Sequence, residues 1–447
     1  MRLSPDDLLA LASDATDGCR LRIAQALRDQ DDPRCEFIEV HCALARAGKA
    51  ADTGALRTRE AQLLAEHQTS WLAEVGLVPG EAVFARGFVD QVAVDVNRAH
   101  GLYARLVSRE PIRELRLQVD LGGSEEDLPR VLAEIREAGL GLSLEQLIID
   151  RRKYWEVIEG DVLEIRRQGQ ETVGLSLRIQ DFERPASGLD LLSIALSPPD
   201  TTRLETLHID ITGRGPNPTE ALTQALRRAG PRPSLREWTM GFSSNTGREW
   251  IRWVRLSSLR ELLELYPCLQ TLVLPMAELQ AERIEHLELR ELFLHWLGLT
   301  PCGPADLRQW EKSPVPKGDG LRFLRDAQLP KLERLGIDFQ YEWYVGWTPE
   351  DVMPLFQSEG LPSLRHLELR WCSFGETLCH ELVRARLSRQ LEVLDLTGTE
   401  LADDGAQTLA RHRDAFPRLK QLVCGRVHES DAAWNALAEL YPLVEPR

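Results

Sequence analysis

The feature that most constrains this chain is a spacing of leucines that recurs along most of its length. The stretch from Leu391 to Leu401 reads LEVLDLTGTEL, and a helical pattern follows directly in ADDGAQTLA. Side chains alternate along a strand, so Leu394 and Leu396 point into a core while Asp395 points to the opposite side. One strand, turn and helix of this size cannot bury its apolar side alone, so similar units must stack beside it.

Eleven further stretches fit the strand half of this unit. Their centres lie mostly 27 to 34 residues apart, with exceptions of 20, 23 and 43. Repeats of about 28 residues leave room for a full helix after each strand. The pattern predicts an α/β leucine-rich-repeat solenoid of about twelve strand–helix repeats, with a parallel concave sheet and outer helices. The eleven stretches are Val89–Val94, Ile112–Leu117, Leu144–Ile149, Leu175–Leu177, Leu204–Ile209, Leu235–Met240, Leu269–Leu274, Leu289–Leu294, Leu332–Ile337, Leu364–Leu369 and Leu419–Cys424.

The segments between these strands carry the helical spacing that such a fold requires. Apolar residues share one helix face in residues 128–135, and residues 218–226, 259–266 and 431–440 show the same spacing. Thr399 occupies the turn position where such repeats usually carry Asn or Cys. Its hydroxyl is therefore expected to hydrogen-bond the turn backbone.

Charge and composition exclude several classes of partner. The 447-residue chain has a formal net charge of −16, which argues against nonspecific binding to nucleic acid or to anionic membranes. No apolar run is long enough to span a membrane and no signal-like core begins the sequence, so a cytoplasmic location is expected. The eight cysteines include no C-x-x-C pair. The neighbours Cys379 and His380 could suggest a metal site, but the place of Cys372 at a repeat turn favours buried structural thiols, so no metal and no cofactor is expected.

Residues 1–80 differ from the repeats and predict a small helical domain. Asp32 and Pro33 suit the start of one helix, and a third long helical pattern runs over residues 56–74. We therefore expect a helical capping domain over residues 1–80 and a repeat solenoid over residues 81–447.

Two motifs in this region resemble a known family. The segment DDPRCEFIEVHCALA begins at Asp31, and the segments WLAEVG and FARGFV begin at Trp71 and Phe84. They are similar to the hallmarks of the bacterial repeat-companion domain, which precedes leucine-rich repeats in myxobacterial and planctomycete proteins. The Trp that this family usually carries in the upstream helix is missing here. The resemblance implies an interaction module with ribonuclease-inhibitor-like repeats, and it implies no catalytic residues.

The open face of the strand array is the usual binding surface of such solenoids, and alternation along the strands identifies its residues. Their charges are mixed, which suits a protein partner better than nucleic acid. For any single residue, the simpler interpretation is a solvated strand side chain. The candidate partner-binding residues on this face are Arg178, His208, Asp210, Glu237, Phe293, His295, Arg334, Asp338, His366, Glu368, Arg370 and Asp395, with Glu114, Arg116 and Asp150 on earlier strands.

Two insertions interrupt the regular spacing. Residues 298–330 are rich in Pro and Gly and predict a surface loop, and residues 339–352 are unusually aromatic. Trp and Tyr dominate the energetics of many interfaces, so this second insertion is another candidate site, although its aromatics could instead pack on the insertion. Trp296 and Trp371 are expected to pack rather than to face solvent. The aromatic candidates are Tyr341, Trp343, Tyr344 and Trp347.

These patterns predict a non-enzymatic scaffold or sensor that binds another protein on the concave face and takes no small-molecule substrate. One alternative is a regulator or inhibitor of a partner enzyme, acting as ribonuclease-inhibitor-like repeats do; strong weakening of binding by salt would favour it. Another is a subunit that uses residues 1–80 to dock onto a larger assembly. A third is an enzyme whose site lies within residues 298–350, where Asp306, Glu311, Asp319 and Asp326 are available.

Overall fold

The computed structural model contains two compact units, residues 1–204 and residues 205–447. Both units alternate strands with helices, so the chain is an α/β protein, and most of its strand pairs are parallel. The structure describes residues 4–13, 17–47, 52–120, 125–153, 156–168, 171–179, 186–196, 201–211, 219–242, 255–256, 259–276, 278–279, 283–296, 321–339, 349–399, 401–424, 431–440 and 443–444.

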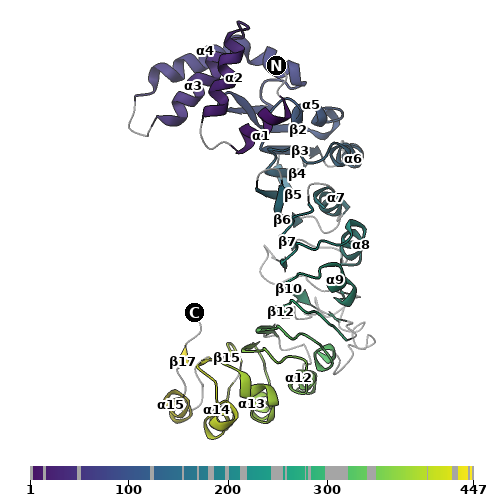
Figure 1. Ribbon diagram of the computed structural model, residues 1–447, viewed down its shortest axis with the longest axis vertical. Helices are drawn as coiled ribbons and strands as arrows, with labels where there is room; N and C mark the ends of the chain where they lie inside the picture. Colours follow the sequence, from purple (N-terminus) through teal and green to yellow (C-terminus); the bar gives the residue numbers. More distant parts are fainter. Residues whose placement is uncertain are drawn as a thin grey trace. The chain divides into compact units, whose positions relative to one another are not determined.

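The first unit opens with helices and continues with strands that have further helices along one side (Figure 1). Its helices are α1 (Pro5–Ser13), α2 (Gly18–Arg28), α3 (Arg34–Arg46), α4 (Gly54–Val75), α5 (Tyr103–Val107), α6 (Leu128–Ala138) and α7 (Ala186–Ala195). Its strands are β1 (Ala82–Ala85), β2 (Phe88–Asp95), β3 (Glu114–Asp120), β4 (Gln146–Lys153), β5 (Glu156–Gln168) and β6 (Glu171–Ile179). Short 3-10 turns lie at Val96–Arg98 and Glu125–Asp127. The boundary predicted near residue 80 falls between α4 and β1, and the capping role of α1–α4 stays a prediction.

Strand direction in the first unit departs from the prediction. β2, β3 and β4 pair in parallel, as expected for repeats. β1 is antiparallel to β2, and β5 is antiparallel to both β4 and β6. The prediction of a strand followed by a helix between Leu144 and Leu177 is therefore wrong: the chain forms a three-strand meander there. Only two residues separate β4 from β5 and β5 from β6 along the chain, which is enough for a hairpin and too few for a parallel crossover.

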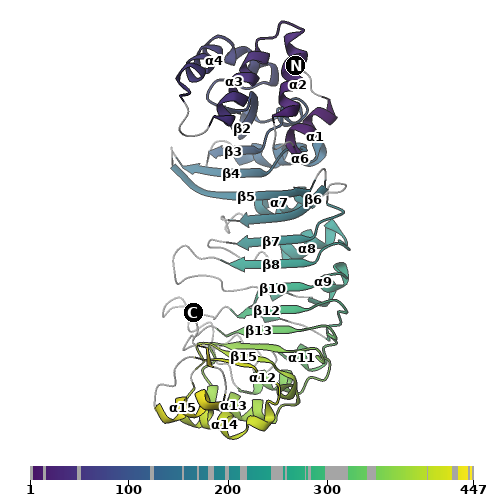
Figure 2. The same ribbon diagram turned by 60° about the vertical axis from the view of Figure 1, so that its left-hand side comes forward.

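In the second unit the described strands of the main sheet pair in parallel, each with the next (Figure 2). Its strands are β7 (Thr206–Ile211), β8 (Glu237–Phe242), β10 (Thr271–Met276), β12 (Glu291–Trp296), β13 (Arg334–Asp338), β14 (His366–Arg370), β15 (Val393–Leu396), β16 (Gln421–Cys424) and β17 (Leu443–Val444), with β9 (Arg255–Leu256) and β11 (Glu278–Leu279) as a separate pair. Its helices are α8 (Thr219–Ala229), α9 (Leu259–Leu265), α11 (Arg322–Arg325), α12 (Pro349–Phe356), α13 (Gly375–Arg384), α14 (Asp403–Arg411) and α15 (Asp431–Leu440), with 3-10 turns at Arg386–Gln390 and Arg413–Ala415. Helices α8, α9, α12 and α13 lie on one side of the strands (Figure 1).

All twelve predicted strands are present, and the predicted helices at 128–135, 218–226, 259–266 and 431–440 correspond to α6, α8, α9 and α15. The template leucines of β12 to β15 are almost completely buried on the helix side of the sheet. Burial of one leucine stabilises the fold by about 1.5–3 kcal/mol relative to exposure. Of the predicted insertions, residues 297–320 and 340–348 lie outside the described residues, while α11 and the start of α12 occupy the remainder.

The hydroxyl of Thr399 forms the hydrogen bonds predicted for the repeat turn. Its Oγ1 donates to the carbonyl of Leu369 at 2.9 Å and accepts from the backbone N–H of Cys372 at 3.3 Å. Both partners belong to the preceding strand and turn. A buried threonine therefore links one strand–turn unit to its neighbour, because backbone groups that leave the ladder at a turn still need partners.

A buried ion pair fastens the N-terminal helices of the first unit to β2. Nη2 of Arg34, at the start of α3, donates to both carboxylate oxygens of Glu110, at 2.7 and 2.8 Å. Glu110 also accepts the N–H of Val89 at 3.0 Å. The guanidinium lies 6.0 Å from the ring centre of Trp71 and 5.6 Å from that of Phe88. Both sequence motifs of this region thus meet at one buried charge pair.

The turn between β1 and β2 explains the glycine of the FARGFV motif. Arg86 and Gly87 both have positive φ, 49° and 87°, which suits a tight hairpin. A Cβ on Gly87 would lie 2.4 Å from Cγ1 and 2.6 Å from Cα of Ile38. Only glycine allows α3 and the hairpin to approach this closely.

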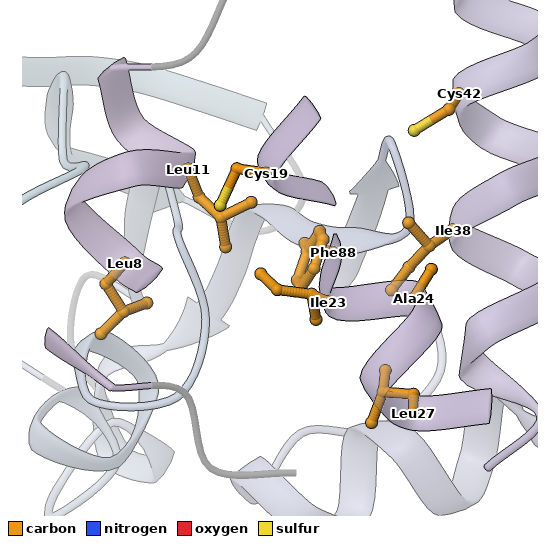
Figure 3. Close-up of a cluster of buried hydrophobic side chains, with 9 residues drawn as sticks. All are labelled: Leu8, Leu11, Cys19, Ile23, Ala24, Leu27, Ile38, Cys42 and Phe88. Atoms are coloured by element: carbon orange, nitrogen blue, oxygen red, sulfur yellow. The ribbon is translucent and has the colours of Figure 1, made fainter. Parts of the chain in front are cut away.

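The apolar faces of α1, α2 and α3 pack on β2 (Figure 3). Phe88 lies among Ile23 and Leu27 of α2 and Ile38 of α3, and all of these side chains are buried. Ile38 and Cys42, four residues apart on α3, both belong to this cluster. The helices and the first strands of this unit therefore share one hydrophobic core.

Candidate functional site

Four adjacent strands, β12 to β15, place many of the predicted partner-binding residues next to one another. Neighbouring parallel strands lie about 4.8 Å apart, so side chains on the same face reach across them. Among the described helices, α8, α9, α12 and α13 lie on the other side of this sheet (Figure 1). The paired positions form three rows, which are Glu291, Arg334, His366 and Val393; Phe293, Gly336, Glu368 and Asp395; and His295, Asp338 and Arg370.

The carboxylate of Glu368 is the centre of this face. Arg334 Nε donates to its Oε1 at 2.7 Å, and Arg370 Nη2 lies 2.6 Å from its Oε2. His366 Nε2 lies 3.2 Å from Oε1. Both oxygens therefore have cationic or N–H partners, which is the condition under which a carboxylate can be buried.

Asp395, on the next strand, extends the network. Its Oδ2 accepts from Nε and Nη2 of Arg370 at 3.0 and 2.7 Å. Its Oδ1 accepts from the backbone N–H of Thr397 at 2.9 Å and from the Thr397 hydroxyl. Arg370 is thus held between two carboxylates, and we refer to Arg334, Glu368, Arg370 and Asp395 as the arginine–carboxylate cluster.

An aromatic ring supports the outer end of Arg334. The guanidinium carbon lies 4.8 Å from the ring centre of Phe293, a distance suited to a cation–π contact. The ring occupies the space above Gly336, where a Cβ would meet it at 2.4 Å. Gly336 is therefore needed for the position of Phe293 and, through it, for that of Arg334.

The protonation states follow from burial and from these partners. Burial lowers the pKa of His366, although the nearby charge of Glu368 opposes this effect. We infer a neutral imidazole at pH 7, with its Nε2 beside Glu368 Oε1. Burial also disfavours the charge of Arg370, but its hydrogen bond to Asp395 and the charges of Glu368 and Asp395 outweigh burial and raise its pKa.

Other predicted face residues lie apart from this cluster. His295 Nδ1 is 3.9 Å from Asp338 Oδ2, which is too long for a hydrogen bond. His208 contacts Thr239 across β7 and β8, and Asp210 lies beside Gly241. Glu237 is exposed on β8.

The remaining open-face candidates belong to the first unit. Arg178 is exposed on β6. Arg116 Nη1 donates to Asp150 at 2.8 Å, and its Nη2 donates to Glu114 at 3.1 Å. In the structure, some of the predicted face residues form one connected cluster in the second unit, and others form a separate, smaller one in the first.

Tyr341, Trp343, Tyr344 and Trp347, the predicted aromatic site, lie outside the described residues. Trp371, however, does not pack as expected: it is 44% exposed. Its φ is 58°, which is rare for a bulky residue, and its backbone N–H donates to Thr397 at 2.9 Å. Its ring covers Gly398, where a Cβ would clash at 2.4 Å. Nothing in the sequence signals a left-handed backbone at a Trp, although Gly398, in the turn after β15, leaves room for its ring.

Thiols and imidazoles do not converge on a metal site in the described chain. Cys379 is buried, whereas His380 is exposed and lies 2.9 Å from Asp404. Burial raises the pKa of Cys372 to about 12. These thiols are therefore protonated, as expected of structural cysteines. No group of three or more His, Cys, Asp or Glu suited to a metal ion occurs among the residues that the structure describes. None of the described helices combines the length and the apolar character needed to cross a membrane.

Comparison with known proteins adds little. No family model and no curated protein matches the chain. Among solved structures, the chain is similar to a Bacteroides fragilis protein whose crystal structure was determined as a structural-genomics target. The two share 16% sequence identity with a TM-score of 0.44, and the match covers 60% of this chain and 73% of that one. This likeness is too slight to carry an argument about function.

Proposed function

We propose that the protein is a cytoplasmic leucine-rich-repeat solenoid that acts as a non-enzymatic scaffold or sensor and binds a protein partner on the open face of β12 to β15. The observation that carries this proposal is the arginine–carboxylate cluster. It is a connected set of charged side chains on the side of the sheet opposite α8, α9, α12 and α13. Charged groups on an exposed sheet face do not stabilise a core, so binding is the simplest reason to hold them in place.

The geometry favours a protein partner. Side chains that are already held by hydrogen bonds and by stacking lose less conformational entropy when a partner binds. Arg334 and Arg370 are held in this way. The exposed ring of Trp371 directly follows Arg370, and Trp and Arg are the residues most enriched among interface hot spots.

The test is a pull-down from a lysate of the native organism. We compare the wild type with a variant that carries His295→Glu, Arg334→Glu and Arg370→Glu. A matched control reverses three exposed arginines elsewhere, Arg384→Glu, Arg386→Glu and Arg389→Glu, and circular dichroism checks that both variants fold. A protein that is retained by the wild type and the control but lost with the face variant supports the proposal. Equal retention by all three moves the site away from β12 to β15.

We also propose that α1–α4 cap the repeats and are not a separate docking subunit. The shared core around Phe88 and the buried pair between Arg34 and Glu110 support this. Deleting residues 1–80 is expected to expose β2 and to cause aggregation. A soluble truncated chain that unfolds cooperatively would favour the docking role.

A further inference from the structure

In the arginine–carboxylate cluster the carboxylates are buried and the guanidinium groups are partly exposed to solvent. The side chains of Glu368 and Asp395 are 2% and 8% exposed, whereas those of Arg334 and Arg370 are 38% and 36% exposed. The cluster contains two acidic and two basic residues, so the sequence alone does not show which charge faces solvent. A partner that approaches the sheet meets the guanidinium groups first.

Each arginine retains hydrogen-bonding capacity toward solvent. Arg334 uses Nε and Nη2 on Glu368, and Arg370 uses Nε and Nη2 on its two carboxylates. Within the described residues, Nη1 of either arginine has no hydrogen-bond acceptor. A guanidinium carries five N–H donors, so both side chains can accept a further oxygen ligand without releasing Glu368 or Asp395.

The charge balance favours contact recognition over long-range attraction. The two arginines and two carboxylates of the cluster cancel, and the neighbouring carboxylates of Glu291 and Asp338 add negative charge to the face. The net charge of −16 on the whole chain opposes approach of an anion from a distance. Charge-assisted hydrogen bonds at short range are roughly twice as strong as neutral ones and can outweigh this repulsion.

We infer that this face recognises an acidic segment of its protein partner, with an Asp or Glu carboxylate bound between Nη1 of Arg334 and Nη1 of Arg370. The inference rests on the proposed function and names the chemistry of the partner. A face of this kind would not favour a basic segment of a partner.

The experiment measures binding of three fluorescein-labelled peptides to the full chain at 150 mM salt by fluorescence anisotropy. The probes are hexaglutamate, hexaglutamine and hexalysine. Wild type is expected to bind hexaglutamate about tenfold more tightly than hexaglutamine, the ratio that one added charge-assisted contact supplies. Hexalysine is expected to bind no better than hexaglutamine.

Two variants with opposite expected effects make the test sharp. Glu368→Gln removes the negative charge below the arginines, so hexaglutamate is expected to bind several-fold more tightly. Arg334→Gln together with Arg370→Gln is expected to weaken it by about tenfold. Arg386→Gln with Arg389→Gln is the matched control, because it removes the same charge from an exposed turn and is expected to leave hexaglutamate affinity unchanged.

The double arginine variant could fail to fold, because it leaves Glu368 buried without a cation. Adding Glu368→Gln to it removes that problem and is still expected to weaken hexaglutamate. Preference of wild type for hexalysine, with weaker binding in Glu368→Gln, would overturn the acidic-partner inference and leave the proposed function intact with a basic partner. Equal affinity of wild type for hexaglutamate and hexaglutamine would overturn the inference as well. The pull-down tests the proposed function independently of either result.

Discussion

Arginine and carboxylate side chains are used in two opposite ways in this molecule. In the first unit, Arg34 and Glu110 form a pair that is 3% and 2% exposed, among aromatic rings and helices. In the second unit, Arg334, Glu368, Arg370 and Asp395 form a network whose arginines face solvent. The arginine–carboxylate pair is therefore fully buried in the first unit, whereas in the second unit the arginines of the network are exposed to solvent.

The contrast separates a structural role from a functional one. A buried ion pair is stable only when both charges have all of their partners. The pair of Arg34 and Glu110 therefore fixes how α3 packs on the hairpin of β1 and β2. The exposed network of the second unit leaves guanidinium N–H donors available for a ligand and contributes little to the hydrophobic core. Burial of the cation, more than the number of ion pairs, distinguishes the two roles.

The largest expected loss of stability comes from breaking the buried ion pair between Arg34 and Glu110. Arg34→Met keeps much of the side-chain volume but leaves Glu110 buried without its cation, which typically destabilises by about 3–5 kcal/mol. Urea unfolding followed by circular dichroism and tryptophan fluorescence measures the change. Arg28→Met, at an exposed pair with Glu39, is the control and is expected to shift the midpoint little. Similar midpoints for both variants would contradict the structural role.

The hairpin glycine offers the next largest effect. Gly87→Ala forces a methyl group against Ile38, whereas Gly80→Ala meets nothing within 4 Å. Both glycines have positive φ, 87° and 97°, so both variants share the backbone strain. We expect Gly87→Ala to be less stable than Gly80→Ala by about 1–3 kcal/mol, from overpacking alone. Thermal unfolding of both variants gives this difference, and equal stability would mean that α3 moves away freely.

A glycine of the open face is expected to behave more mildly. Gly336→Ala also meets a side chain at 2.4 Å, but that side chain is the half-buried ring of Phe293, which can rotate outward. The loss is then mainly the contact between Phe293 and Arg334, worth about 0.5–1 kcal/mol. Gly241→Ala on β8, where the added Cβ meets Asp210 at 3.3 Å, is the control. A loss as large as that of Gly87→Ala would show that this face is as rigid as the core.

A buried histidine in the second unit extends the comparison to pH. His286 Nε2 donates to the carbonyl of Tyr266 at 3.0 Å, and its Nδ1 accepts the N–H of Leu289 at 3.0 Å. Burial lowers its pKa below the ordinary 6.5, so the unfolded chain binds a proton more readily. Its contribution is complete above about pH 6.5 and falls as the pH drops below that value, by at most about 1.4 kcal/mol per pH unit.

The measurement is the free energy of unfolding between pH 5 and 7.5 for the wild type and for His286→Gln. Other titrating groups act on both proteins and cancel in the difference. The stability difference is expected to shrink as the pH falls. A constant difference would show that His286 does not titrate in this range.

The repeat pattern predicted every strand it was applied to, but it could not find β5. Residues 156–168 read EVIEGDVLEIRRQ, which alternates like a strand but lacks the leucine spacing of the repeat. Antiparallel insertions need only a two-residue link, and no periodic signal marks them. The existence of the twelve repeat strands therefore followed from the sequence, whereas β5 and the strand directions in the meander did not.

Alternation likewise placed Glu368 on the open face but not beneath two arginines. Arg334, 34 residues before it, reaches it because β13 pairs with β14, whereas Arg370 lies two residues after it on the same strand. Equivalent template leucines, such as Leu335 and Leu367, do pair, but the leucine pattern does not record which charged side chains contact one another. The exposure of Trp371 escaped for a similar reason, since it depends on a positive φ beside Gly398.

The meander of β4, β5 and β6 also has a consequence for how such a chain can lengthen. Two reversals of direction restore the original polarity, so β6 runs the same way as β4 and is followed by a helix, α7. A single added strand would instead deliver the next helix to the opposite end of the sheet. Insertion of antiparallel strands between two repeats is thus constrained by parity: such strands are added in twos, because an odd number would reverse the direction of every later repeat.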